Sequence, residues 1–181
     1  MVMVPHCDAL VFLAPCYSNH VWGTDITYIR MKTGFMYLTL FMDWFSRYVI
    51  SWELSDTLDT DFVVAAFERA MCTGKPEIVN SDQGSQYTSQ RYVQTPKRYG
   101  VHISMDGRGR CMDNIFTERL WRTVKYEEVY LADYESPRQA RMGLGRYLRD
   151  YNIFRPHSSL KGLTPHDVYF GNYTLADFEG S

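Results

Sequence analysis

The amino-acid sequence predicts an α/β protein, with helices on both faces of one mixed five-stranded sheet. Between positions 21 and 54, three segments rich in β-branched and aromatic residues follow one another, separated by short turns. From position 59 onward the apolar residues recur at helical spacing, and short apolar runs then alternate with helical segments. A chain of 181 residues is long enough to form one domain with a sizeable core.

The first three strands are expected to form an antiparallel meander. Val21–Arg30 and Phe35–Met42 flank Lys32-Thr33-Gly34, whose composition is typical of a hairpin turn. Arg47–Leu54 follows a second turn at positions 43–46. Three consecutive strands that are joined by tight turns pair as antiparallel neighbours.

Helices and strands alternate in the rest of the chain. The elements expected there are a helix capped by Asp59 or Thr60 and stopped by Gly74, a strand at Glu77–Asn80, a helix at Ser89–Tyr99, a strand at Val101–Ser104, and a helix from Asn114 to about Glu128 that Asp113 caps. A last long helix begins at Ser136-Pro137, an N-cap followed by proline, and runs to about Tyr151. The tail after Pro165 is expected to be irregular.

Charge is distributed unevenly along the chain. The net charge is −2, but residues 1–90 carry 5 basic and 10 acidic side chains, whereas residues 91–161 carry 14 basic and 8 acidic ones. Residues 162–181 add 3 acidic and no basic side chains. A polyanionic partner would therefore meet the segment 91–161.

The composition argues against several classes of protein. No apolar run approaches the roughly 20 residues of a membrane span. The N-terminal segment has Asp8 before its short apolar run and no Lys or Arg before Arg30, which is unlike a signal peptide. The four cysteines are widely spread without a C-x-x-C pair, which argues against a zinc ribbon and a disulfide framework. We expect a cytoplasmic protein with no membrane partner.

Three acidic residues are candidates for chemistry. Asp25 lies inside the first strand, among residues typical of a core, where a charge is costly unless it is paired or liganded. Asp82 follows the fourth strand in the stretch NSDQGSQYTSQ and, taken alone, is typical of a turn. Glu118 lies within the helix that begins near position 114, and taken alone it is typical of an ion pair with Arg122.

These three carboxylates could converge at one edge of the sheet, because the expected order places the first and fourth strands side by side. Clustered carboxylates raise one another's pKa unless a cation neutralises them. Hard oxygen ligands suit Mg²⁺ or Mn²⁺, and two such ions about 3.5–4 Å apart are the usual apparatus of in-line phosphoryl transfer. Asp43, in contrast, starts a turn, and we assign it a structural role.

Five longer motifs occur in order along the chain. They are VWGTDITYIR, MDWFSRYVISWELS, NSDQGSQYTSQ, SMDGRGRCMDNIFTERLWRTVKYEEVYL and YNIFRPHSSLKGLTP. Together they closely resemble the catalytic subunit of bacterial insertion-sequence transposases, which belongs to the retroviral-integrase-like DDE superfamily. The resemblance covers about residues 20–170. It implies a ribonuclease H-like fold, an integrase-type catalytic core at 21–170, a non-family segment at 1–20 and a C-terminal tail at 171–181.

The resemblance also implies a set of catalytic residues. The metal-binding triad of the family matches Asp25, Asp82 and Glu118, and the 35 residues between the second and third members are the spacing characteristic of the family. The basic residue that the family carries seven positions after the glutamate matches Lys125, which could reach DNA phosphate. The implied reaction is DNA strand cleavage followed by strand transfer, with Mg²⁺ or Mn²⁺ as two ions and without a covalent enzyme intermediate.

The implied partner is DNA, both as transposon ends and as target, bound by a homo-oligomer. A separate helix-turn-helix subunit could recognise the ends, because the family carries a helical DNA-binding region upstream of the core. Tyr87 and Trp121 could stack on exposed bases, but core packing is the favoured interpretation. Seven basic residues are candidate phosphate contacts: Arg108, Arg110, Arg122, Lys125, Arg138, Arg141 and Arg155.

Two alternatives remain open. A related metal nuclease would use the same carboxylates to cut DNA without joining it. The other alternative is a transposase fragment that binds DNA without catalysis or acts as a dominant negative. It is suggested because only about 20 unfamiliar residues precede the core, as in an N-terminally truncated copy. In addition, Pro96 falls inside the helix behind Asp82, where proline costs roughly 3 kcal/mol.

Overall fold

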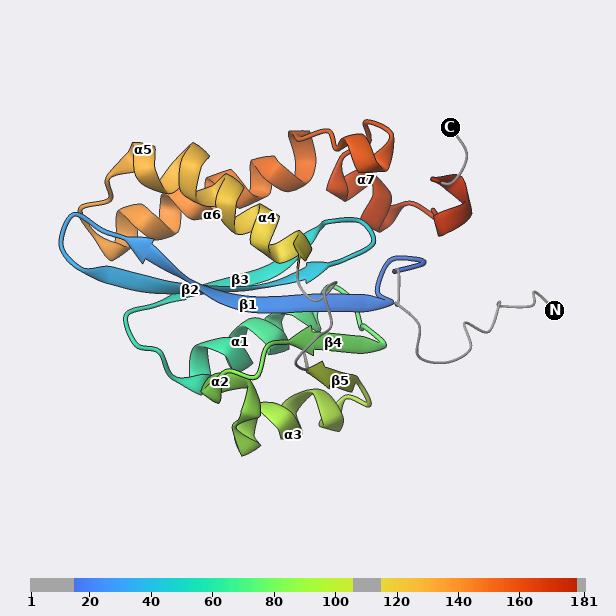
Figure 1. The fold of residues 1–181 in the computed structure, drawn as a ribbon, viewed down its shortest axis with the longest axis horizontal. Helices are drawn as coiled ribbons and strands as arrows, with labels where there is room; N and C mark the ends of the chain where they lie inside the picture. The colour runs from blue at the N-terminus through green and yellow to red at the C-terminus, as the bar shows by residue number, and fades with distance from the viewer. Residues whose placement is uncertain (1–14, 106–114, 179–181) are drawn as a thin grey trace.

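The computed structural model describes residues 15–105 and 115–178, and a five-stranded sheet runs through the centre of the molecule (Figure 1). The strands are β1 Val21–Arg30, β2 Phe35–Asp43, β3 Val49–Ser55, β4 Ile78–Ser81 and β5 His102–Met105. Their order in the sheet is β3-β2-β1-β4-β5. The first three strands pair antiparallel, whereas β4 lies parallel to both β1 and β5. The predicted mixed sheet is confirmed, including the adjacency of the first and fourth strands.

Helices cover both faces of the sheet. They are α1 Thr60–Ala70, α2 Ser85–Thr88, α3 Gln90–Arg98, α4 Ile115–Val124, α5 Tyr130–Ala132, α6 Pro137–Phe154 and α7 Pro165–Phe170. Shorter turns are η1 Lys125–Val129, which is π-helical, and the 3₁₀ turns η2 Ser158–Leu160 and η3 Leu175–Asp177. The helices α1 to α3 lie on one face, and α4 to α6 lie on the other (Figure 1).

Each face of the sheet has its own apolar core, because side chains along a strand alternate between the faces. In β2, Leu38 and Leu40 belong to the core under α4 and α6, while Phe41 belongs to the core under α1 and α3. In β1, Ile29 contributes to the first of these cores and Trp22 to the second. Neither Trp22 nor Phe41 is accessible to solvent.

The structure corrects the sequence predictions in four places. Ser85–Thr88 forms the short helix α2 within a stretch that was expected to be a loop. The third strand begins at Val49 instead of Arg47, because Arg47 has φ +65° in the turn. The helix expected to end near Glu128 continues through η1 to Ala132. The tail is not irregular throughout, because the capping box of Thr164 begins α7.

Pro96 does not break its helix. It lies near the end of α3, and its carbonyl accepts hydrogen bonds from the backbone N–H groups of Tyr99 (3.0 Å) and Val101 (3.1 Å). Gly100, with φ +69°, donates to the Lys97 carbonyl at 3.0 Å. This is the Schellman arrangement of a helix C-terminus, which places proline in the last turn of the helix. The expected disruption of the support behind Asp82 is therefore not observed.

Asp43 has the structural role that the sequence predicts. The side chain is fully buried, and it accepts hydrogen bonds of 2.7 Å from the backbone of Asn19 and from the backbone and hydroxyl of Ser46. Burial raises the pKa of this carboxyl, and the Ser46 and Asn19 hydrogen bonds oppose the rise. These bonds fix the turn between β2 and β3.

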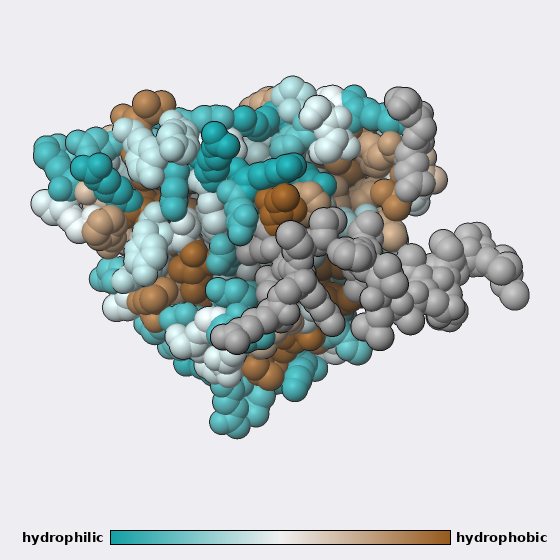
Figure 2. All heavy atoms as spheres, in the orientation of Figure 1, coloured by the Kyte–Doolittle hydropathy of each residue, from teal (hydrophilic) through white to brown (hydrophobic). Residues whose placement is uncertain are grey.

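Apolar side chains on the surface are scattered. Large exposed hydrophobic side chains include Leu131, Phe154, Met142 and Tyr126, with accessibilities of 65–77%. On the face drawn in Figure 2, the brown groups are small and lie among polar side chains. No helix in the described part of the chain is long and apolar enough to cross a membrane.

Candidate active site

Asp25 lies in the middle of β1, on the face of the sheet that α4 covers. The side chain is half-buried. One carboxylate oxygen, Oδ2, accepts a 2.9 Å hydrogen bond from the Trp121 indole Nε1 of α4. The other oxygen, Oδ1, accepts a 2.8 Å bond from the backbone N–H of Ile26. Both oxygens of this carboxylate are therefore oriented by fixed donors.

The environment of Asp25 disfavours its charge. Burial raises the pKa of the Asp25 carboxyl, and the Trp121 and Ile26 hydrogen bonds oppose that rise. The negative charges of Asp82 and Glu118 raise the pKa further. Asp82 and Glu118 are thus both close enough to Asp25 to act on its carboxyl, and a cation bound there would relieve the repulsion.

Asp82 directly follows the C-terminal end of β4 and is exposed. Its Oδ1 accepts a 2.9 Å hydrogen bond from the backbone N–H of Gly84, which precedes α2. A Cβ atom at Gly84 would lie only 2.9 Å from that same oxygen. Glycine is therefore required at this position if the carboxylate is to keep its present orientation. The pairing of Gly23 in β1 with Asn80 in β4 brings the two aspartates, each two residues further on, to the same end of the strand pair.

Glu118 lies on α4, which packs against β1. It is exposed, whereas Trp121, one turn further on, is buried with 6% accessibility. Residues three and seven positions after Glu118 lie on the same helical face, so Trp121 and Lys125 share this face with it. Among the residues that the structure describes, no ion pair joins Glu118 to Arg122, so the alternative of a local ion pair has no support.

The donor set fits a divalent cation in its chemistry, because three carboxylates supply only hard oxygen ligands. Across residues 15–105 and 115–178, no group of three or more His, Cys, Asp or Glu side chains is close enough to hold a metal ion. Within these residues the three carboxylates therefore do not form a ligand cage. Asp82 and Glu118 are both exposed, which leaves their side chains room to move toward Asp25.

The predicted phosphate contacts fall into three groups. Arg108 and Arg110 lie outside the described residues. Arg122, Lys125 and Arg138 are exposed or half-exposed, and no ion pair of theirs is recorded within the described part of the chain. Arg141 contacts Glu53 at 2.6 Å and donates to the Leu54 carbonyl at 2.9 Å. Arg155 forms a bidentate pair with Glu127. The last two arginines are thus engaged within the chain.

The hydrogen bond of Trp121 to Asp25 is not predicted by the sequence. Core packing is the expected role for Trp121 and also for Tyr87, and both side chains are buried. Tyr87 lies on the opposite face of β1, 3.3 Å from the Thr24 hydroxyl. The available signal was the i,i+3 spacing of Trp121 from Glu118, which places the indole on the face that meets β1.

Two family models cover most of the chain. Residues 17–111 match the model of the integrase core domain, and residues 99–165 match a second integrase core domain model. The chain is 37% identical over 153 residues to the transposase for insertion sequence element IS904 of Lactococcus lactis subsp. lactis (strain IL1403), which covers 82% of this chain and 60% of that protein. It is 34% identical over 162 residues to transposase InsF for insertion sequence IS3A of Escherichia coli (strain K12), with coverages of 87% and 56%. The chain thus spans somewhat more than half the length of these curated relatives.

Solved structures with a similar fold include viral integrase catalytic cores. One chain of the simian T-cell lymphotropic virus intasome in complex with PP2A regulatory subunit B56 gamma aligns with a TM-score of 0.72 at 20% identity, covering 86% of this chain and 55% of that one. The HTLV-2 integrase catalytic core domain in complex with magnesium aligns with a TM-score of 0.68 at 22% identity, with coverages of 86% and 98%. These similarities confirm the ribonuclease H-like fold.

Proposed function

The chain belongs to the integrase core domain family, and from that premise we propose that it is the catalytic core of a DDE-type insertion-sequence transposase. As a polynucleotidyl transferase it cuts a DNA strand and joins the 3′ end to target DNA. Asp25, Asp82 and Glu118 are the proposed ligands of Mg²⁺ or Mn²⁺, as two ions. The observation that carries this proposal is the half-buried Asp25, which is held by Trp121 and repelled by the charges of the other two carboxylates.

Each residue of the site has a role that follows from its position. Trp121 and the Ile26 backbone hold the Asp25 carboxylate in one orientation, and Gly84 does the same for Asp82. Lys125 shares the helical face of Glu118 and contacts a DNA phosphate beside the carboxylates. Divalent cations, when bound, lower the pKa of the attacking water or 3′-hydroxyl and neutralise charge on the leaving oxygen.

DNA is the proposed partner, as element ends and as target, and the exposed Arg122 and Arg138 are proposed phosphate contacts. We place the protein in the cytoplasm with the DNA. Homo-oligomers on DNA are supported by the relative HTLV-2 core, which is described in a dimeric and a trimeric form. Recognition of the element ends by a separate helix-turn-helix subunit remains part of the proposal.

The test is strand cutting and strand joining by the purified protein with Mg²⁺ or Mn²⁺, using uncut element ends for cutting and pre-cleaved ends for joining, each labelled on one strand. We expect Asp82→Asn to reduce joining at least about 10³-fold, because a neutral amide is a poor ligand for a hard cation. The matched control is Glu68→Gln, which neutralises an exposed acid on α1, on the opposite face of the sheet. The control should join strands at the wild-type rate.

Three outcomes separate the proposal from its alternatives. Undiminished joining by Asp82→Asn would remove Asp82 from the site. Cutting without joining by the wild-type protein would indicate a metal nuclease. A folded wild-type protein that binds DNA but neither cuts nor joins would indicate a non-catalytic fragment.

A further inference from the structure

The helix that carries Glu118 changes its geometry at Lys125. From Ile115 to Val124 it is α-helical, and from Lys125 to Val129 it is π-helical. A π-helical turn takes one more residue than an α-helical turn, so the side chains that follow it are rotated relative to those that precede it. Such turns are rare and need support from neighbouring groups. Lys125 therefore lies where the helix face that carries Glu118 ends and the rotated face of the π-helical turn begins.

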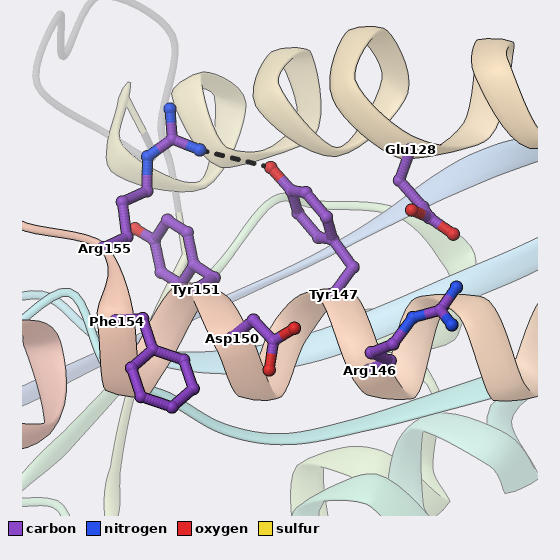
Figure 3. Close-up of a pocket in the computed structure, with 7 residues that line it drawn as sticks. All are labelled: Glu128, Arg146, Tyr147, Asp150, Tyr151, Phe154 and Arg155. Carbon is purple, nitrogen blue, oxygen red and sulfur yellow. Dashed lines mark hydrogen bonds between the residues drawn. The ribbon is translucent and has the colours of Figure 1, made fainter.

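The π-helical turn is tied to α6 through Glu127. Arg155, directly after α6, donates from Nη1 and Nη2 to the two carboxylate oxygens of Glu127, at 2.5 and 2.8 Å. Tyr147, two turns earlier on α6, donates from its hydroxyl to Glu127 Oε2 at 2.8 Å. Arg155 also donates to the Tyr147 hydroxyl at 3.4 Å, as Figure 3 shows. A planar guanidinium that meets a carboxylate with two parallel bonds fixes orientation as well as distance.

A second tie lies one residue further along. The Tyr134 hydroxyl donates to Glu128 Oε1 at 2.6 Å. A Cβ atom at Gly143 of α6 would lie 2.5 Å from that hydroxyl and 2.6 Å from that oxygen. Glycine on α6 thus lets the helix approach the turn, and Figure 3 shows Glu128 pointing from the turn toward α6. Both glutamates of the turn are therefore occupied by groups of the same chain.

We propose that Glu127, Tyr147 and Arg155 form a clamp that holds the π-helical turn and thereby positions Lys125 beside the carboxylates. This inference rests on the function proposed above. Arg155 is then a positioning residue and not a phosphate contact, because Glu127 already fills its guanidinium fork. The pair lies at the surface, with side-chain accessibilities of 38% for Arg155 and 45% for Glu127. Each of the three side chains acts through Lys125, which contacts the DNA.

The clamp and a direct phosphate contact predict different consequences when Glu127 is neutralised: one changes the rate of joining, and the other changes the affinity for DNA. If Arg155 bound phosphate, Glu127→Gln would release it and tighten DNA binding. If Arg155 and Glu127 form a clamp, the same change loosens the turn and slows joining. Arg155→Lys adds a second distinction, because lysine keeps the positive charge but cannot form the bidentate pair.

The experiment uses the full chain and three measurements on Glu127→Gln, Arg155→Lys and Arg155→Ala. The clamp predicts that joining at saturating DNA falls by roughly tenfold in all three, since small displacements of a catalytic group are costly. It also predicts that amide hydrogen exchange at Lys125–Val129 rises by at least about tenfold. The slope of log affinity against log salt concentration, measured for binding to an element-end duplex, should stay unchanged. Loss of a phosphate contact would instead lower that slope by about one.

The matched control is Arg149→Ala, which removes an exposed arginine of α6 that pairs with its neighbour Asp150. It should leave exchange in the π-helical turn unchanged. The clamp is overturned if Arg155→Ala lowers the salt slope by about one while exchange at Lys125–Val129 stays at the wild-type rate. Hydrogen exchange and DNA binding need no strand joining, so they decide the clamp even if the wild-type protein joins no DNA.

Discussion

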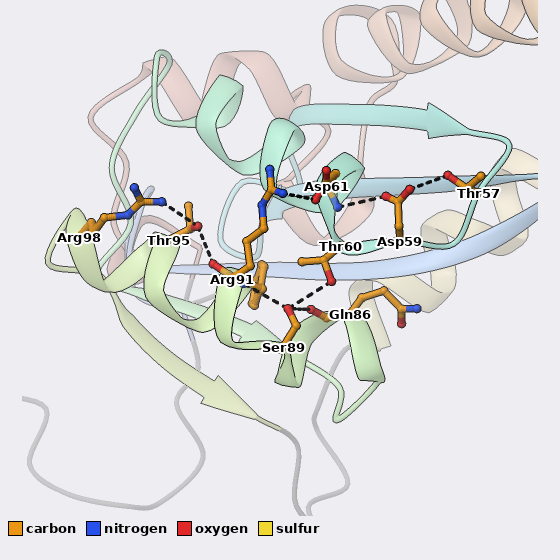
Figure 4. Close-up of polar contacts among 10 residues, drawn as sticks. Thr57, Asp59, Thr60, Asp61, Gln86, Ser89, Arg91, Thr95 and Arg98 are labelled. Carbon is orange, nitrogen blue, oxygen red and sulfur yellow. Dashed lines mark hydrogen bonds and ion pairs between the residues drawn. The ribbon is translucent and has the colours of Figure 1, made fainter.

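The two faces of the sheet differ in what the hydrogen bonds between helix and strand orient. On the α1–α3 face, β1 contributes Trp22, which is fully buried in an apolar core with Phe67 and Tyr92. The polar contacts drawn in Figure 4 connect the ends of α1, α2 and α3 to one another. Helix-to-strand hydrogen bonds occur there too, since Tyr87 of α2 lies 3.3 Å from the Thr24 hydroxyl and Arg69 of α1 donates to Glu53. On the α4–α6 face there is also an apolar core, and the helices there bond to a carboxylate of β1 and to the backbone of β3. Trp121 bonds to Asp25, and Asn152 bonds to both backbone groups of Val49.

Apolar burial and hydrogen bonds contribute differently to the fold: the first stabilises a helix on the sheet, and the second fixes the orientation of particular groups. Apolar burial stabilises a helix on a sheet, but it is non-directional and tolerates small shifts. Hydrogen bonds between helix and strand fix orientation, which a carboxylate site requires. The face that carries the proposed chemistry is the one on which a helix orients a proposed metal ligand, Asp25.

The largest expected effect is a loss of folding stability when the apolar core on the α1–α3 face is disrupted. Phe67→Ala removes a fully buried ring that packs edge-on against Phe41, so the free energy of unfolding should fall by about 3–5 kcal/mol. Urea unfolding followed by circular dichroism measures this. Leu131→Ala, at a side chain with 77% accessibility on the other face, should change it by less than about 0.5 kcal/mol. Equal losses in the two variants would contradict the comparison.

Most of the strands and helices can be predicted from local sequence patterns. All five strands were predicted within two residues of their observed bounds, because β-branched residues, turns and period-2 alternation are local signals. The helix α2 was missed, since Ser85–Thr88 forms a single turn with no apolar period of its own. The tail helix was missed although Thr164-Pro165 is a recognisable N-terminus, the same signal that located α6.

The site was predicted less completely. Asp25, Asp82 and Glu118 were predicted from the misplaced charge in β1 and from the motif resemblance. The charges of Asp82 and Glu118 raise the pKa of Asp25, but within the described residues the three carboxylates do not form a group that could hold a metal ion, so the triad stays a prediction. The partners that orient them depend on tertiary contacts across long sequence separations. Trp121 is 96 residues from Asp25, and Arg155 is 28 residues from Glu127. No local period reports such a pairing, so Arg155 was assigned to DNA.

A smaller effect is expected at the loop of Asp82. Gly84→Ala places a Cβ within 2.9 Å of Asp82 Oδ1, so the carboxylate must turn away. Since φ −57° and ψ 153° suit alanine, unfolding should change by less than about 0.5 kcal/mol. Strand joining should fall by about 10- to 100-fold. Ser85→Ala, at the exposed neighbouring position, is the control that should retain joining. Joining unaffected by Gly84→Ala would show that this orientation of Asp82 is not required.

The smallest expected effect is a pH dependence of the free energy of unfolding that arises from Asp25, on the face that α4 covers. Burial raises the pKa of Asp25 above its unfolded value of 3.8, so the folded protein binds more protons between these two values. The free energy of unfolding should therefore fall as pH rises through that window, by about 1.4 kcal/mol for each unit of pKa difference. Asp25→Asn removes this decline, and Asp43, which has the same direction of shift, is present in both proteins and cancels in the difference.

Urea unfolding of wild type and Asp25→Asn in EDTA, from about pH 4 to pH 7, measures the difference. Tyr87→Phe supplies the matched comparison on the opposite face of β1. Burial raises the pKa of Tyr87 well above its usual value, so this hydroxyl stays neutral throughout the range. The stability difference between Tyr87→Phe and wild type should therefore be constant with pH. If the Asp25→Asn difference were equally constant, the charge of Asp25 would be no more costly in the folded chain than in the unfolded one, and the electrostatic contrast between the two faces would fail.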